Sequence, residues 1–280
     1  MTHIRQERIG PIAIITIDRP ARFNALDART AQDFRRAGLQ LARDDDIRVV
    51  VLRGRPGMFC SGADLKFIRD GGDPADLGYL RPRDAGRGYG EVFKQILEYI
   101  HSTISEIRRA PKPFIASIDG IAAAGGFGIA MACDLAIAST RASFEWAYAK
   151  TGLTGAESST FLLPRLVGWR RAMELALLNP RLAADQALAY GLITRVVEPD
   201  ALERETMAVA ERLAAGPRHA FAVAKELLNQ SAGFDQLDAH LDRELQELAR
   251  AADGPEVVEG VAAFFEKRSP RFHAGDAGAG

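Results

Sequence analysis

The chain has 280 residues, of which 47% are hydrophobic and 26% charged, a composition that excludes wholesale disorder and a fibrous protein. Its 36 Lys and Arg residues against 37 Asp and Glu give a formal net charge of −1, so no global positive field favours nucleic acid as a partner. Two cysteines, Cys60 and Cys133, cannot build a disulfide framework, and no stretch suits a signal peptide or a membrane span. We therefore expect a cytoplasmic protein.

The first two-thirds of the chain alternates strand patterns with helix patterns. Residues 4–9 and 12–17 alternate around the Gly10-Pro11 turn, which predicts two antiparallel strands. Strands alternating with helices imply crossover connections and parallel pairing, so the predicted fold class is α/β. The expected helices cover 27–43, 91–109 and the segment after Gly126, and the expected buried strands cover 47–52, 114–118 and 135–138.

Composition changes in two later parts of the chain. The segment 70–90 holds six glycines and two prolines without apolar periodicity, which predicts a surface loop, and GDAGAG at 275–280 is typical of a flexible tail. After about Pro199 only helical periodicity continues, through 201–215, 221–230, 234–252 and 257–268. We therefore expect a core domain at 1–199 and a helical region at 200–280.

Two glycine-rich turns follow predicted strands. FCSGADL at 59–65 precedes an apolar-periodic stretch, so the backbone N–H groups near Gly62 and Ala63 are expected to be unpaired at a helix start. A second strand at 113–120 runs into AAAGGFG at 122–128. Such donors can stabilise an oxyanion, although a glycine-rich turn of this kind, taken alone, more often serves only close packing. The spacing matches neither a dinucleotide-binding GxGxxG nor a P-loop.

Taken together, these motifs resemble those of the enoyl-CoA hydratase/isomerase family, the crotonase superfamily. The resemblance covers nearly the whole chain, through Arg19-Pro20, Asn24-Ala25-Leu26, FCSGADL, KPFIASIDG at 112–120, AGGFGIAMACD at 124–134, LPRLVG at 163–168 and AFFEKRSPRF at 263–272. It implies a spiral of ββα units whose helical C-terminal region mediates a homotrimer or a dimer of trimers. It also implies an acyl-CoA thioester substrate whose carbonyl oxygen accepts hydrogen bonds from the amides of Ala63 and Gly125.

The resemblance also locates two positions at which hydratases of this family carry glutamates. Here these positions are Gly128 and Tyr148. Because addition of water needs groups that exchange protons near the working pH, standard hydration is not expected. The surrounding sequence is more similar to the 4-chlorobenzoyl-CoA dehalogenase branch, which has an aromatic residue at the Tyr148 position and a histidine at that of His101. The aspartate nucleophile of that branch aligns with Ala156, so dehalogenation is not expected either.

Glu157 is the first candidate for a catalytic base, with Tyr148 as an orienting or proton-donating partner. The alternative for Glu157 is structural, because Thr154-Gly155-Ala156-Glu157 fits a capping box. Glu145 is the second candidate, although strand alternation favours a solvent-facing position for it. His101 lies at the edge of an apolar helical stripe, so it is either a boundary residue or part of the acyl pocket.

Further residues are expected around the CoA group of a substrate. By resemblance, Arg22, Phe264 and Lys267 contact its nucleotide end, with ordinary surface positions as the alternative. Asp64 is more plausibly a helix cap than an acid. No metal and no separate cofactor are implied, because CoA belongs to the substrate. The sequence thus predicts an acyl-CoA enzyme that uses a stabilised enolate for isomerisation, hydrolysis or a related reaction. The alternative is a catalytically silent acyl-CoA-binding protein or pathway subunit.

Overall fold

The computed structural model describes residues 3–73 and 89–273 and contains a twisted six-stranded sheet. The strand order is β1-β2-β3-β4-β6-β9; β1 and β2 are antiparallel, and every other pairing is parallel. The predicted opening hairpin and the parallel crossovers are therefore confirmed. The strands are Ile4–Ile9 (β1), Ile12–Ile17 (β2), Val49–Gly54 (β3), Phe114–Ile118 (β4), Leu135–Ser139 (β6) and Arg195–Val197 (β9).

A smaller three-stranded sheet lies beside the first, in the order β5-β7-β8. It consists of Ile121–Ala123 (β5), Ser143–Glu145 (β7) and Leu182–Ala183 (β8). β5 follows β4 after only two residues, and β7 follows β6 after three. Each of these strand pairs therefore carries the chain from the large sheet to the small one, and the small sheet forms one wall of the candidate site.

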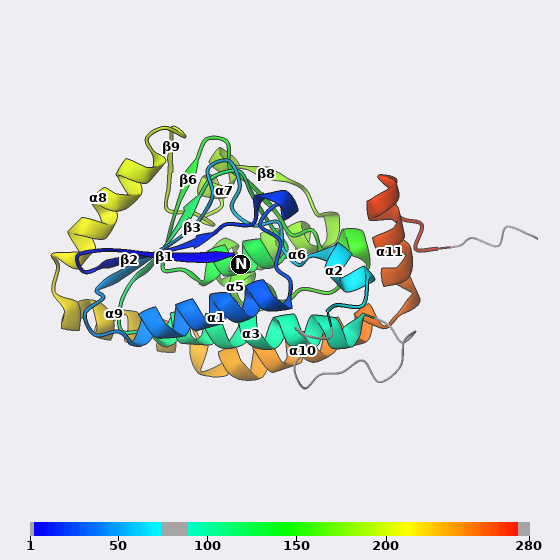
Figure 1. Ribbon diagram of the computed structural model, residues 1–280, viewed down its shortest axis with the longest axis horizontal. Helices are drawn as coiled ribbons and strands as arrows, with labels where there is room; N and C mark the ends of the chain where they lie inside the picture. The colour runs from blue at the N-terminus through cyan, green and yellow to red at the C-terminus, as the bar shows by residue number, and fades with distance from the viewer. Residues whose placement is uncertain (1–2, 74–88, 274–280) are drawn as a thin grey trace, which may run out of the picture.

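Both faces of the large sheet are covered by helices, which is why β2, IAIITI, is buried at all six positions. One face packs against α1 and α3, and the other against α8. Figure 1 shows α1, α3 and α10 running side by side along one side of the molecule, with α8 across the sheet from them. These helices are Ala28–Arg43 (α1), Gly90–Arg109 (α3), Leu202–Ala214 (α8) and Leu237–Ala252 (α10).

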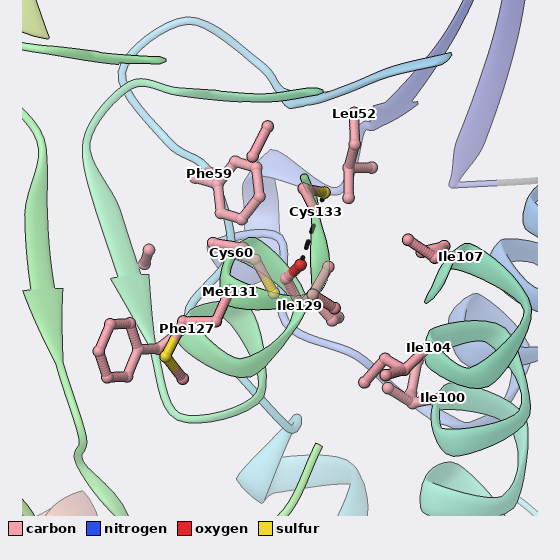
Figure 2. Packing of buried hydrophobic residues seen from close by; sticks show 14 of the residues in the cluster. Leu52, Phe59, Cys60, Ile100, Ile104, Ile107, Phe127, Ile129, Met131 and Cys133 are labelled. Carbon is pink, nitrogen blue, oxygen red and sulfur yellow. Dashed lines mark hydrogen bonds between the residues drawn. The ribbon is translucent and has the colours of Figure 1, made fainter. Parts of the chain in front are cut away.

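The core continues into a short buried helix, α4, Gly125–Ala132, all eight residues of which are buried. Figure 2 shows Phe127, Ile129 and Met131 of this helix beside Phe59 and Cys60, while isoleucines of α3 face the same core. An apolar helix of this kind fits only inside the protein. It holds the glycine-rich turn at its N-terminus in a fixed position.

The remaining helices surround this core. They are Leu65–Arg69 (α2), Ser159–Val167 (α5), Trp169–Leu178 (α6), Ala184–Ala189 (α7), Arg218–Ser231 (α9) and Pro255–Glu266 (α11), with 3-10 turns at Pro20–Arg22 (η1), Tyr148–Thr151 (η2) and Phe234–Gln236 (η3). All elements from 202 to 266 are helical, and α10 and α11 pack back against α3 and η2. Most of the expected loop at 70–90 and the expected tail at 275–280 lie outside the described residues. No helix in 3–73 and 89–273 is long and apolar enough to cross a membrane.

Candidate active site

The two glycine-rich turns of the sequence lie against each other. Cys60 donates its N–H to Ile121 O at 3.0 Å, and Cys60 O accepts from Ala123 N at 3.0 Å. This pair of bonds fixes the 59–65 segment beside β5. A Cβ at Gly126 would lie 2.2 Å from Cys60 O, so only glycine permits α4 to approach the neighbouring backbone this closely.

The backbone amides of Ala63 and Gly125 donate no hydrogen bond to another described residue. Leu26 N donates to Gly62 O at 2.8 Å, and Asp64 N donates to Leu26 O at 2.9 Å. In a parallel bridge of this kind, the N–H of the residue between the two, Ala63, points away from Leu26. Gly125 begins α4, so its N–H has no acceptor within the helix. Both residues line one cavity. The arrangement suits a carbonyl oxygen that becomes negative during a reaction.

This cavity has a volume of about 490 Å³ and a largely apolar wall. Phe93 of α3 and Leu248 of α10 meet Ile121 and Leu153 there. The wall thus combines the α/β core with the C-terminal helices. Among the described residues, no group of three or more His, Cys, Asp or Glu side chains is arranged to hold a metal ion.

Glu157 supplies a buried carboxylate to the cavity. A Cβ at Gly125 would lie 2.8 Å from Glu157 Oε1, which places this oxygen beside the candidate oxyanion turn. The Tyr148 hydroxyl donates to the other oxygen, Oε2. Burial raises the pKa of Glu157 to about 7, although the hydrogen bond from Tyr148 opposes this rise. The carboxylate therefore changes charge near neutral pH, as a general base should.

The capping-box interpretation of Glu157 is wrong. Helix α5 begins only at Ser159, with Ser158 as its N-cap, so Glu157 precedes the cap instead of occupying the third helical position. Its backbone φ of 50° lies in the left-handed region. Its side chain accepts a hydrogen bond from Tyr148 instead of bonding to an N-cap backbone.

His101 lies behind Glu157 and does not line the cavity, contrary to the acyl-pocket expectation. It belongs to α3 and is 6% exposed, and its Nε2 accepts the Glu157 N–H at 3.1 Å. Burial lowers the pKa of the imidazole to about 3, so the ring is neutral. His101 thus supports the backbone of the Glu157 turn.

The expectation that Glu145 faces solvent is also wrong. Its carboxylate is only 3% exposed and forms ion pairs with Lys150 and, at 3.1 Å, with Arg181. All three residues line the cavity. Because two cations already neutralise this carboxylate, Glu145 is a poor candidate for a base.

Of the three residues expected around the CoA group, two line the cavity. Arg22 and Phe264 line it, whereas Lys267 is exposed and does not. Arg22 also binds Asp64. Asp64 caps α2 by accepting from the amides of Lys66 and Phe67, at 3.0 and 3.1 Å, so its predicted capping role is confirmed.

Comparison with known proteins identifies the chain. The model of a family described as "Enoyl-CoA hydratase/isomerase" matches residues 7–275. The chain belongs to the enoyl-CoA hydratase/isomerase family. A 4-chlorobenzoyl coenzyme A dehalogenase-2 from an Arthrobacter species is 32% identical over 265 residues, 95% of this chain and 91% of the relative. A 1,2-epoxyphenylacetyl-CoA isomerase of Escherichia coli K12 is 35% identical, over 93% of this chain and 94% of the relative.

A solved structure extends this relationship to the fold. The crystal structure of an enoyl-CoA hydratase from Mycobacterium avium subsp. paratuberculosis superimposes with a TM-score of 0.84 at 31% identity, covering 97% of this chain and 99% of the other. The crotonase fold inferred from the motifs is therefore confirmed, with its paired sheets and helical C-terminal region.

Within the enoyl-CoA hydratase/isomerase family, this site has little room for the first expected hydratase glutamate. A Cβ at Gly128 would lie 2.3 Å from the carbonyl oxygen of Glu157 and 2.8 Å from its Cβ. The Glu157 turn thus occupies the space that a side chain at position 128 would need. The second expected position is Tyr148, whose phenol is buried and has a pKa raised above 10 by that burial and by Glu157.

Sequence reasoning missed two residues near the site, Glu244 and Leu248. Both lie on α10 in line with Leu237 and Leu241, a stripe of three- and four-residue spacing that is buried in the structure. Leu248 lines the cavity. A carboxylate within an apolar helical stripe is the signal that would have identified Glu244.

Proposed function

We propose that this chain is an acyl-CoA enzyme that moves a carbon–carbon double bond, converting a 3-enoyl-CoA into a 2-enoyl-CoA. One observation carries the proposal: the buried carboxylate of Glu157, which forms no ion pair with a described residue, lies beside the amide of Gly125 in a largely apolar cavity. A double-bond shift needs one base that removes a proton and returns it. Hydration, by contrast, uses one group that takes a proton from water and another that delivers a proton to the substrate carbon.

The proposed reaction begins with the thioester oxygen between the N–H groups of Ala63 and Gly125. Glu157 Oε1 takes a proton from carbon 2, and the electron pair of the broken C–H bond delocalises into a dienolate with negative charge on the thioester oxygen. The two amides stabilise this charge. The carboxylic acid then returns the proton to carbon 4, which leaves the double bond between carbons 2 and 3 and restores the carboxylate.

Tyr148 serves the same step by holding Glu157. Its hydroxyl donates to Oε2, which leaves Oε1 directed toward the Gly125 turn. Because its pKa is raised, the phenol stays protonated throughout neutral pH. It therefore orients the base without competing for the substrate proton.

A 3-hexenoyl-CoA assay tests the proposal, with formation of the conjugated 2-enoyl thioester followed by absorbance and mass spectrometry. The Glu157→Gln variant should lose about 10²- to 10⁴-fold in kcat/KM. Glu247→Gln is the matched control, because Glu247 pairs with Arg243 and Arg250 at the surface of α10. In D2O, retention of part of the original carbon-2 hydrogen at carbon 4 supports a single base.

Other products would contradict this proposal. Ready conversion of crotonyl-CoA to 3-hydroxybutyryl-CoA would establish hydration, and release of free CoA would establish thioester hydrolysis. Binding of acyl-CoA without any product from saturated, 2-enoyl, 3-enoyl or aromatic thioesters would favour the silent binding protein, the alternative consistent with the absent carboxylates at Gly128 and Tyr148.

The proposal extends to the CoA group, assembly and location. Arg22 and Phe264 at the cavity suit the nucleotide end of CoA, and Lys267 suits it as a mobile phosphate partner of the same or a neighbouring subunit. A homotrimer or dimer of trimers remains the expected assembly, and the cytoplasm the expected location. Exposed apolar side chains on α6 support association: Trp169, Met173, Leu177 and Leu178.

A further inference from the structure

A second carboxylate, Glu244, is buried behind the candidate base and takes no part in the proposed reaction. It lies on α10, is 5% exposed, and belongs to the helix face that packs inward. A buried carboxylate is costly unless its oxygens accept hydrogen bonds. The partners of Glu244 therefore indicate why the chain keeps it.

The hydrogen bonds to Glu244 come from Ser158 in the turn that carries Glu157, and from Thr160 and Phe161 in the first turn of α5. Glu244 Oε2 accepts from Ser158 N at 2.8 Å, and its Oε1 accepts from Thr160 N at 2.9 Å and from the Thr160 hydroxyl. Glu157 and Ser158 both have left-handed backbone conformations, with φ of 50° and 62°. Such a conformation is strained in residues other than glycine and persists only where neighbouring groups hold it.

Glu157 is faced by groups from several elements, and none of them carries a positive charge. Tyr148 comes from η2 and His101 from α3, while Cys60 lies below the turn. Burial lowers the pKa of His101 to about 3 and raises that of the Cys60 thiol to about 12. Glu244, from α10, is therefore the group whose charge opposes ionisation of Glu157.

Among the residues that the structure describes, Glu244 likewise has no cationic partner. His101 Nε2 is 3.8 Å and His240 Nε2 is 3.7 Å from its carboxylate, and burial lowers the pKa of each imidazole. The carboxylates of Glu157 and Glu244 thus lie in one buried region without compensating cations. Two interacting acids of this kind release their protons as a coupled pair.

We infer that Glu244 is a positioning residue for Glu157: it holds the strained turn from the C-terminal helices and places a second negative charge behind the base. The inference rests on the proposed function only in taking Glu157 as the base. Burial raises the pKa of Glu244, like that of Glu157, to about 7. Ionisation of either carboxyl group near neutral pH therefore raises the pKa of the other.

The Glu244→Gln variant tests this coupling, with Glu247→Gln on the same helix as control. The glutamine side chain carries no charge and keeps one oxygen that can accept a hydrogen bond from the Glu157 turn. We expect the ionisation seen in the pH profile of kcat/KM for 3-hexenoyl-CoA to move to lower pH, by on the order of one pH unit. The Glu247→Gln profile should match the wild type. An unchanged Glu244→Gln profile would overturn the inference and leave Glu244 a structural residue.

A direct titration separates failure of this inference from failure of the proposed function. Carboxyl-carbon NMR of glutamate-labelled protein follows ionisation of Glu157 without any substrate. A shift in Glu244→Gln supports the coupling even where no isomerase activity is found. If that variant does not fold, the reciprocal measurement applies: the Glu244 carboxyl should titrate at lower pH in Glu157→Gln than in the wild type. Identical titrations would refute the coupling.

Discussion

Glu157 combines three features that rarely occur in one residue: near-complete burial, a left-handed backbone and a carboxylate that accepts from a phenol. Each is unfavourable or restrictive for the folded state. Together they fix an acid beside the Gly125 amide with a pKa close to neutrality. The residue therefore illustrates how a site stores destabilising features that its function needs.

This view predicts that removing the charge of Glu157 stabilises the protein at high pH. Burial raises its pKa from the ordinary 4.5 to about 7, so the folded state binds the proton more tightly than the unfolded state. As pH rises from about 4.5 through about 7, the free energy of unfolding contributed by this group falls. Above pH 7 the Glu157→Gln variant has no carboxylate to ionise at this position, so its free energy of unfolding should exceed that of the wild type by about 3 kcal/mol.

Urea unfolding at pH 5 and pH 8, at one protein concentration, provides the measurement. The two proteins should differ little at pH 5, where the wild-type carboxyl is still protonated in the folded state. A variant that is less stable than the wild type at both pH values would show that Glu157 stabilises the fold.

Among the elements, the contact between α4 and the Glu157 turn decides which chemistry the site can hold. Gly128 of α4 lies under the carbonyl oxygen of Glu157, where a Cβ would have only 2.3 Å. Neither the glycine nor the turn can move alone, because Glu244 holds the turn from its other side. Exchange of a single residue is therefore insufficient to build a two-glutamate hydratase here.

Gly128→Ala should displace the Glu157 turn. Overpacking a buried contact of this kind costs about 1–3 kcal/mol, and the displaced carboxylate should lose isomerase activity. Gly128→Glu should likewise fail to hydrate crotonyl-CoA. Thermal unfolding and the two product assays check both variants. Hydration by Gly128→Glu with normal stability would contradict the steric argument.

The elements were more predictable than the contacts between them. Apolar spacing gives β1, β2, α1, α3 and β4 within two residues, because burial of one face or both imposes a period on the sequence. The positions of the two glycine-rich turns at 59–65 and 122–128 were predictable from the glycines at strand ends. The burial of Glu145 could not be predicted in this way, because its partner Arg181 is distant in sequence. The capping-box error arose because a left-handed Glu157 delays the helix start in a way that residue types do not reveal.

At the scale of the whole molecule, the C-terminal helices complete the site as well as cover the core. α10 contributes Leu248 and α11 contributes Phe264 and Phe265 to the cavity, while Glu244 of α10 binds the backbone of the Glu157 turn. Helix α6, by contrast, exposes several large apolar side chains. The molecule thus has one set of helices for the site and one face suited to association.

Association through α6 predicts a specific effect of one substitution. Leu178 is 76% exposed, so Leu178→Asp should leave the monomer folded while opposing burial of this face in an oligomer. Sedimentation velocity should give a trimer or hexamer for the wild type and a smaller species for the variant. Glu174→Gln, on the same helix, is the control. A wild type that sediments as a monomer at micromolar concentration would refute this assembly.

The dependence of Glu157 on Glu244 has a consequence for synthesis of the protein. Ser158 is anchored by a carboxylate 86 residues further along the chain, and chains emerge from the ribosome N-terminal end first. A nascent chain that already contains both oxyanion turns and Glu157 still lacks the anchor of its turn. The proposed catalytic centre is therefore completed only after residue 244 has been made, so that a translation product truncated before it carries both glycine-rich turns and Glu157 without the group that holds Glu157 in place.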